Sequence, residues 1–296
     1  MSVELAAGSE TISRLEHAMR RLDAATLEPQ PLPDEDPVLV AGIGWRSGST
    51  LVQRALMTDP TLLVWGEPMD RIFYLDRLTE ALLAVTDDWP PDDQLISHRP
   101  QVDLVRDWVA TLSPDPGHLK AGHRAFFDQW LGTPARQRGF SRWGFKEVRC
   151  SAAHALVWRW LYPRSSIVLV VRHPVMAYAS LLRSGFTPPH AGAVLRWPDV
   201  WLRSAEDFAG AWNVMALSWW SVLDRLGVHW LRYEDLVEGR VDLDAIGASI
   251  GLRLHAAEAL ASDAGKGLAA ATVSTDERDL INALTAEGRE RFAYAE

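Results

Sequence analysis

The strongest constraint on the fold is a repeated pattern: a short apolar run is followed by a segment whose apolar residues lie three and four positions apart. The run Val38 to Ala41 is the first example, and Ile167 to Val171, five consecutive β-branched or leucine residues, is the clearest. Short unbroken apolar runs are typical of strands buried on both faces, and the three-and-four spacing is typical of helices. The sequence therefore predicts an α/β fold, with a mainly parallel central sheet flanked by helices.

The same patterns divide the rest of the chain. Strands are predicted at 38–41, 62–65, 143–145, 167–171 and 228–231. Helices are predicted at 11–27, 49–57, 70–86, 101–112, 123–131, 151–161, 174–183, 205–226, 234–238, 241–250 and 255–261. A last helix is predicted to begin at Ser274, where Ser-Thr-Asp-Glu fits a capping box with Glu277. We interpret residues 1–30 as a helical extension and residues 31–296 as one domain, with a long Gly- and Pro-rich loop at 184–199.

The chain is acidic, with 39 Asp and Glu residues against 30 Lys and Arg residues and a formal charge of −9. Such a surface repels nucleic acid and anionic membranes, so an anionic ligand must be held by a local cluster of cations. Only three of the basic residues are lysines, namely Lys120, Lys146 and Lys266. A lysine at a motif position is therefore informative in this chain.

The single cysteine, Cys150, excludes an intrachain disulfide and a cysteine-rich metal site, and we expect it to be a small buried side chain. No apolar run approaches the ~18 residues that cross a bilayer. The first residues also lack a basic segment followed by an apolar core. We therefore expect a soluble cytoplasmic protein with no nucleic-acid or membrane partner, and the sequence leaves homo-oligomerisation open.

The turn after the first strand, Gly42-Ile-Gly-Trp-Arg-Ser-Gly-Ser-Thr50, is typical of an anion site. It leads into a helix N-terminus, where backbone N–H groups and the positive end of the helix dipole converge. Gly44 and Gly48 permit close approach of an oxyanion, and Arg46 adds charge. The turn is not a Walker A loop, because no lysine follows Gly48, and its glycine spacing does not fit the dinucleotide fingerprint. The alternative is a tight strand-to-helix turn without a ligand.

A second polar segment follows the strand at 167–171. Arg172 stands at the tip of that strand, and Ser180 lies eight residues later in the next predicted helix. Open α/β folds bind ligands at the carboxyl ends of their strands. We expect Ser180 to face the same side as Arg172 if the helix packs back toward the strand.

These segments together resemble the two cofactor loops of the sulfotransferases that use 3′-phosphoadenosine 5′-phosphosulfate (PAPS). Arg46-Ser-Gly-Ser-Thr50 and the pair Arg172 and Ser180 match those loops in order, spacing and setting. Arg232-Tyr-Glu-Asp-Leu236 looks like the Tyr-Glu-Asp-Leu segment of the same family. The resemblance covers residues 38–236, about two-thirds of the chain.

The resemblance implies a P-loop-like sulfotransferase fold, PAPS as the donor, 3′-phosphoadenosine 5′-phosphate (PAP) as its product and no metal. It implies that the 5′-phosphosulfate is bound by Arg46, Ser47, Gly48, Ser49 and Thr50. It further implies that Arg172 and Ser180 bind the 3′-phosphate, that Tyr233 lines the adenine pocket and that Lys266 belongs to a late basic loop on the 3′-phosphate. Where the family often has an aromatic residue soon after the first loop, this chain has Leu51 and Val52.

Three residues are candidates for the transfer step, in which charge builds on the leaving bridge oxygen and cations stabilise it. Arg46 is the first. Lys146 is the second, because Trp143-Gly-Phe-Lys resembles the Trp-Gly-x-Lys segment of many bacterial members; its alternative is a solvated lysine at a strand end. Glu67 is the third, because Gly66-Glu resembles the segment of the bacterial and protein-tyrosine branches whose Glu is the proposed base.

Other interpretations of these residues stay open. Glu67 is alternatively an N-cap or the ion-pair partner of Arg71, and His123 and His173 are the other candidate bases. Five of the fourteen Trp residues, those between positions 197 and 220, divide into two groups. We expect those at 212–220 to pack a long helix into the core, whereas Trp197 and Trp201 either line an acceptor pocket or pack inside.

The resemblance implies an enzyme that moves a sulfuryl group onto a hydroxyl or amine of a small-molecule or peptide acceptor. The sulfated product is either final or a leaving-group intermediate for a later reaction. Two alternatives belong to other classes: a nucleotide-binding kinase-like protein and a non-catalytic partner subunit that keeps the sulfotransferase fold.

Overall fold

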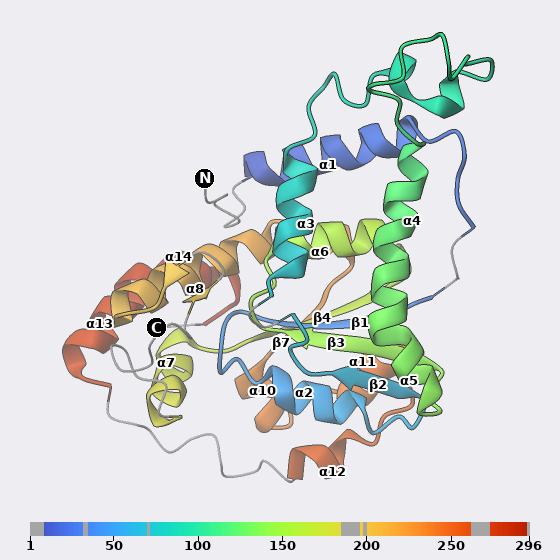
Figure 1. The fold of residues 1–296 in the computed structure, drawn as a ribbon. Coiled ribbons are helices and arrows are strands. Elements are labelled where there is room, and N and C mark those ends of the chain that lie inside the picture. The colour runs from blue at the N-terminus through green and yellow to red at the C-terminus, as the bar shows by residue number, and fades with distance from the viewer. Residues whose placement is uncertain are drawn as a thin grey trace.

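The computed structural model contains a five-stranded sheet in which every strand is parallel, in the order β2-β3-β1-β4-β7 (Figure 1). These strands are β1 (Val38–Gly42), β2 (Leu62–Trp65), β3 (Arg142–Glu147), β4 (Ser166–Val171) and β7 (His229–Arg232). The structure describes residues 9–31, 35–69, 72–184, 196–197, 200–261 and 273–294. The predicted fold class, an α/β fold with a parallel central sheet, is confirmed.

Alternate residues of the strands pack into two cores, one on each face of the sheet. In β1, Leu39 and Ala41 belong to one core and Val38 and Val40 to the other. The first core includes residues of α1 (Ser9–Ala24), α3 (Tyr74–Leu83), α6 (Ala152–Leu161) and α8 (Ala205–Trp220). The second includes residues of α2 (Ser49–Leu56), α11 (Leu243–Ser249) and α12 (Ala256–Ala261). Burial on both faces explains why β1 and β4 read as unbroken apolar runs.

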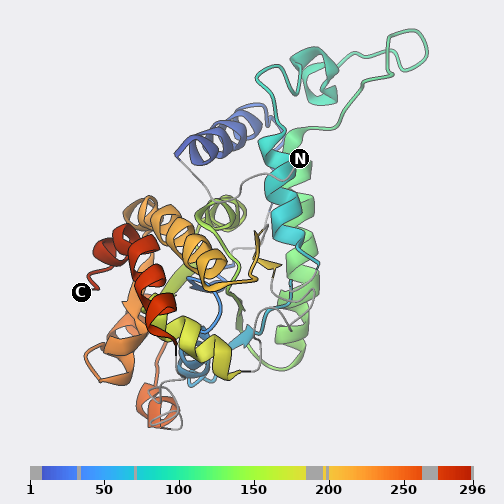
Figure 2. The same cartoon turned by 90° about the vertical axis from the view of Figure 1, so that its left-hand side faces the viewer.

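The remaining elements complete these layers. They are α4 (Pro116–Phe127), α5 (Thr133–Gln137), α7 (Pro174–Arg183), α9 (Leu223–Leu226), α10 (Tyr233–Val237), α13 (Thr275–Leu284), α14 (Ala286–Arg291) and a small antiparallel pair, β5 (Arg196–Trp197) with β6 (Val200–Trp201). Figure 2 shows α7 beside α13, in agreement with their contacts.

Several local predictions are confirmed. The apolar face of α1, formed by Ile12, Leu15, Met19 and Leu22, is buried in the first core. The predicted capping box is present, with Ser274 as the N-cap of α13 and Glu277 at its third position. Trp212, Trp219 and Cys150 are also buried as expected, and Trp219 Nε1 donates to the Cys150 carbonyl over 2.8 Å. The expectation is wrong for Trp220, the last residue of α8, which is 38% exposed.

The helix predicted at 101–112 is wrong, because these residues form turns and bends. The apolar side chains that suggested a helix face solvent: Leu104 is 63% exposed, Val105 92% and Trp108 73%. This segment belongs to the long connection between α3 and α4, which projects from the body of the molecule in both views (Figure 1, Figure 2). Apolar spacing produces a helix only where a neighbouring surface buries the apolar face.

Other helices also have boundaries that differ from the prediction; the helix predicted at 70–86, for example, is α3, Tyr74–Leu83. The helix predicted at 123–131 begins as α4 at Pro116, because Asp115 caps it by accepting from the Gly117 N–H over 2.8 Å. The helix predicted at 205–226 is interrupted, since α8 ends at Trp220 and α9 starts at Leu223. At the break, Ser221 Oγ donates to the Ser218 carbonyl over 2.7 Å and competes with the backbone for that acceptor.

Candidate active site

All five strands of the sheet end at one cavity of about 310 Å³. Each strand, or the short segment after it, contributes a polar group: the 46–50 turn follows β1, Glu67 follows β2, Lys146 is in β3, Arg172 follows β4 and Tyr233 follows β7. The other lining residues are Trp45, Leu51, Arg54 and Val148. Parallel pairing is what gathers these groups, because it aligns the carboxyl ends of the strands at one edge.

The turn between β1 and α2 has a backbone that only a few residue types adopt easily. Gly44, Arg46 and Gly48 have φ values of 75°, 65° and 97°. At Gly48 a side chain would also overlap the ring of Tyr233, so this position requires glycine for two reasons. Gly48 caps α2, whose N-terminus opens onto the cavity. The start of α2 is therefore available to an anion.

Ser47 lies away from the cavity, unlike its neighbours in the turn. It is fully buried, its hydroxyl packs against Gly42, and Oγ has no hydrogen-bond partner. Ser49 and Thr50 do line the cavity. Three hydroxyl side chains were expected to bind the 5′-phosphosulfate, and the structure places two of them, those of Ser49 and Thr50, at the cavity.

The two predicted loops are in direct contact. Arg46 Nε donates to Ser180 Oγ over 3.1 Å, and Arg172 Nη1 donates to the Arg46 carbonyl over 3.1 Å. The Arg172 guanidinium also lies over the ring of Tyr233, 4.2 Å from its centroid. Burial lowers the pKa of Arg172, whereas Tyr233 and Glu234 raise it. Arg172 thereby joins the ends of β1, β4 and β7 in one cluster.

Glu67 and Lys146 form an ion pair between Oε1 and Nζ. Lys146 is 5% exposed, which contradicts the alternative of a solvated lysine at a strand end. The register of β2 on β3 sets Trp65 against Phe145, so the next residues of both strands emerge together at the cavity. Arg71, the other ion-pair partner considered for Glu67, lies outside the described residues.

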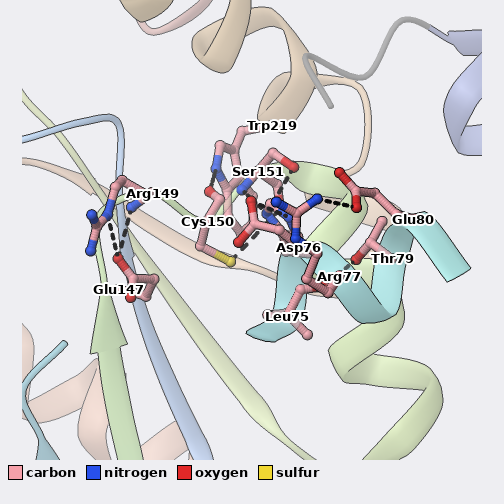
Figure 3. Close-up of polar contacts among 11 residues, drawn as sticks. Leu75, Asp76, Arg77, Thr79, Glu80, Glu147, Arg149, Cys150, Ser151 and Trp219 are labelled. Atoms are coloured by element: carbon pink, nitrogen blue, oxygen red, sulfur yellow. Dashed lines mark hydrogen bonds and ion pairs between the residues drawn. The ribbon is translucent and has the colours of Figure 1, made fainter. Parts of the chain in front are cut away.

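Two charged residues that the sequence analysis missed stand directly behind this pair. Arg149 Nη2 lies 3.8 Å from Glu67 Oε2. Arg149 Nε lies 3.4 Å from Glu147 Oε1 (Figure 3). Burial raises the pKa of Glu147 to about 7, against the opposing effect of Arg149. The sequence does carry a signal for these two residues, since Lys146-Glu-Val-Arg149 follows directly on the apolar strand predicted at 143–145. Charged side chains at the end of a buried strand need partners of opposite charge.

Residues 37–252 match the model of the Sulfotransferase family. The chain belongs to this family. No protein with a curated description matches the sequence.

Several solved sulfotransferase structures are similar in fold to this sulfotransferase family member. The sulfotransferase domain of the Synechococcus PCC 7002 olefin synthase is 18% identical, with 91% of this chain and 99% of that one covered and a TM-score of 0.47. The sulfotransferase from Alicyclobacillus acidocaldarius is 16% identical, with coverages of 87% and 94% and a TM-score of 0.45. The sulfotransferase domain from the curacin biosynthetic pathway is 13% identical, with coverages of 90% and 99% and a TM-score of 0.48.

The other candidate bases lie outside the cavity of this sulfotransferase-family chain. Burial lowers the pKa of His173 to about 4, and its backbone N–H donates to Glu234 Oε1 over 3.1 Å. Burial also lowers the pKa of His123, whose Nδ1 lies 3.3 Å from the Tyr74 hydroxyl. Neither histidine lines the cavity, so among the candidate bases only Glu67 does.

Some predictions fall outside the described residues, namely those on Lys266 and on most of the 184–199 loop; the side chains of Trp197 and Trp201 are likewise not described. Within the described ranges, no group of three His, Cys, Asp or Glu side chains could hold a metal ion. Among the helices described, none is both long and apolar enough to span a bilayer.

Proposed function

We propose that the protein transfers a sulfuryl group from PAPS to a hydroxyl or amine of a small-molecule or peptide acceptor. The observation that carries this proposal is the convergence of Arg46, Arg172 and Lys146 with one carboxylate, Glu67, in a single cavity. Such cations suit an anionic nucleotide donor, and the carboxylate suits removal of a proton from the acceptor. Membership of the sulfotransferase family supports the same reaction.

The residues present fit a donor with two separate anionic groups. The backbone N–H groups of the Ser47 and Gly48 turn, Arg46 and the hydroxyls of Ser49 and Thr50 would hold the 5′-phosphosulfate at the start of α2. This donor set needs no hydroxyl from Ser47, whose Oγ points elsewhere.

At the other end of the donor, Arg172 and Ser180 would hold the 3′-phosphate. The Ser180 hydroxyl suits this role because it accepts from Arg46 and keeps its own O–H for donation. Tyr233 would form one wall of the adenine pocket, and Trp45 adds a second aromatic side chain to the lining. Lys266 keeps its proposed place on the 3′-phosphate from the sequence resemblance alone.

PAPS would supply an activated sulfuryl group, whose bond to the phosphate oxygen breaks as the acceptor atom bonds to sulfur. Lys146 and Arg46 would stabilise the negative charge on the leaving oxygen, and Glu67 would take the proton of the acceptor. Lys146 and Glu67 are paired with each other in the structure. An anion at the start of α2 would compete with Glu67 for Lys146, and Glu67 Oε1 would then be able to accept a proton.

Calorimetry with PAP, and separately with ATP and Mg²⁺, tests the choice of donor. We expect PAP to bind more tightly, because the turn lacks the Walker lysine that follows the last glycine in kinases. Tighter binding of ATP with Mg²⁺ would overturn the proposal in favour of the kinase-like alternative.

Transfer of a labelled sulfuryl group from PAPS to a panel of phenols and amines tests catalysis. The Glu67→Gln variant should bind PAP no more weakly than the wild type, and its transfer rate should fall by about 100-fold or more. Glu290→Gln, an exposed substitution on α14, is the matched control and should transfer normally. PAP binding without transfer by the wild type across the panel would favour the non-catalytic alternative.

A further inference from the structure

Glu67 lies between two cations that differ in their access to the cavity. Lys146 Nζ contacts Oε1 and lines the cavity, whereas Arg149 approaches Oε2 at 3.8 Å and is not among the lining residues. The Arg149 side chain is 6% exposed and that of Glu67 is 26% exposed. A ligand in the cavity can therefore draw Lys146 away from Glu67, while Arg149 stays on the protein side of the carboxylate.

Arg149 is held in place by contacts on its other sides. Glu147 Oε1 accepts from the Arg149 backbone N–H over 3.2 Å and lies 3.4 Å from Nε (Figure 3). The ring of Phe73 lies 5.4 Å from the guanidinium carbon. Glu147 is in β3, where it pairs in register with Ala41 of β1, so the anchor of Arg149 belongs to the rigid sheet. The guanidinium is thus fixed between two carboxylates, one structural and one in the cavity.

The four side chains alternate in charge: Lys146, Glu67, Arg149 and Glu147. A buried cation with a single carboxylate partner would bind that carboxylate strongly and reduce its ability to accept a proton. Here Glu147 offsets the charge of Arg149 from behind. Glu67 therefore has a partner that orients it and whose charge is already largely balanced.

We propose that Arg149, anchored by Glu147, is the positioning residue of Glu67: it holds Oε2 so that Oε1 faces the acceptor when Lys146 is engaged by the donor. This inference rests on the proposed function, since it gives Glu67 the role of base. Arg149 touches neither the donor nor the acceptor in this arrangement and acts only through Glu67.

The arrangement makes Glu67 sensitive to the protonation of Glu147. Burial raises the pKa of Glu147 to about 7, and Glu67 raises it further while Arg149 and Lys146 lower it. Asp76 of α3, His154 of α6 and Cys150 line a second, small cavity together with Glu147 and Arg149. When Glu147 takes up a proton as the pH falls, it no longer offsets the charge of Arg149, which then holds Glu67 more tightly.

Carbon-13 NMR of the full chain labelled at the glutamate carboxyl carbons tests this coupling. The carboxyl resonances of Glu67 and Glu147 are assigned as those missing from the spectra of Glu67→Gln and Glu147→Gln. The spectrum of the wild type is then recorded as the pH is varied across the neutral range. We expect the Glu67 resonance to change as Glu147 titrates, and this change to be lost in Arg149→Gln. Asp128→Asn, which alters a different buried carboxyl group outside the cavity lining, is the control and should keep the change.

Two outcomes separate this inference from the proposed function. A Glu67 resonance that is indifferent to the titration of Glu147, in a protein that binds PAP, would overturn the inference alone. Failure of the wild type to bind PAP in calorimetry would overturn the proposed function, whatever the NMR coupling.

Transfer rates provide a second test of Arg149. If Glu67 is the base, Arg149→Gln should lower the rate of transfer to a phenol about ten-fold or more without changing PAP affinity, because a misdirected carboxylate transfers protons poorly. Arg149→Lys should restore part of that rate.

Discussion

Arg46 Nε donates a hydrogen bond to Ser180 Oγ over 3.1 Å, although the two residues are 134 positions apart in the chain. Because Arg172 also donates to the Arg46 carbonyl, hydrogen bonds join the turn after β1 both to the end of β4 and to α7. Groups fixed in this way lose little freedom when a ligand binds. A substitution that breaks the contact between the two loops should therefore weaken ligand binding, and it tests the site directly.

Ser180→Ala should weaken PAP binding about ten-fold to 100-fold, since hydrogen bonds to charged groups contribute about 1.5–3 kcal/mol. Calorimetry measures the effect. Ser184→Ala is a matched control at the end of the same helix, where the hydroxyl donates only to the Leu181 carbonyl over 2.7 Å. Equal PAP affinities for the two variants would contradict a role for Ser180.

Gly48→Ala should destabilise the protein more than Gly139→Ala does. Both glycines have positive φ, 97° and 89°, and the left-handed backbone alone costs an alanine about 1–2 kcal/mol. At Gly48 the new methyl group would overlap the Tyr233 ring. At Gly139 the new methyl group would enter open space, with no neighbouring atom within 4 Å. Urea denaturation measures both variants, and adding Tyr233→Leu to Gly48→Ala should recover part of the loss. Equal losses for the two alanine variants would show that the ring contact is unimportant.

The stability of the protein should depend on pH through Glu147. Burial raises the pKa of this carboxyl from 4.5 to about 7, so between these values the folded protein keeps a proton that the unfolded chain releases. The stability from this group is full below the unfolded value and falls as the pH rises through the folded one. Glu147→Gln abolishes that fall, and its free energy of unfolding relative to the wild type should rise by about 3 kcal/mol over this interval.

Urea denaturation at a series of pH values measures this dependence on Glu147. Glu290→Gln, at an exposed position, should follow the wild type at every pH. A difference between Glu147→Gln and the wild type that stays constant across the interval would refute the assignment.

Tyr294→Phe should weaken the segment that carries Arg172. The Tyr294 hydroxyl lies 2.7 Å from Glu234 Oε2 and 3.1 Å from the Val171 carbonyl, next to Arg172 in the chain. Losing a buried hydrogen bond costs about 1–3 kcal/mol, so we expect a lower melting temperature and weaker PAP binding. The control is Tyr74→Phe, which removes a hydroxyl that contacts His123 and should leave PAP affinity unchanged. A Tyr294→Phe variant that binds PAP like the control would contradict the link to Arg172.

Much of the fold and part of the site could be predicted because they depend on local sequence. The strands β1, β2 and β4 appear as short apolar runs, and the residues that follow them, such as Glu67 and Arg172, necessarily emerge at their carboxyl ends. The turn at 42–50 is local in the same sense, since its glycines specify the backbone. The segment at 101–112 shows the limit of such patterns, because its apolar spacing meets no surface that would bury it.

The sequence by itself therefore determined the five strands, most of the helices and the polar residues that stand at the strand ends. Only the tertiary structure decided how those residues pair. The order of the strands sets β2 beside β3 and so brings Glu67 to Lys146 and Arg149, and the packing of α7 brings Ser180 to Arg46. It also turned the Ser47 hydroxyl away from the cavity and buried Glu147 behind Glu67. The reason is physical: backbone conformation follows from neighbours along the chain, whereas ion pairs and pKa shifts depend on distances between segments that only folding brings together.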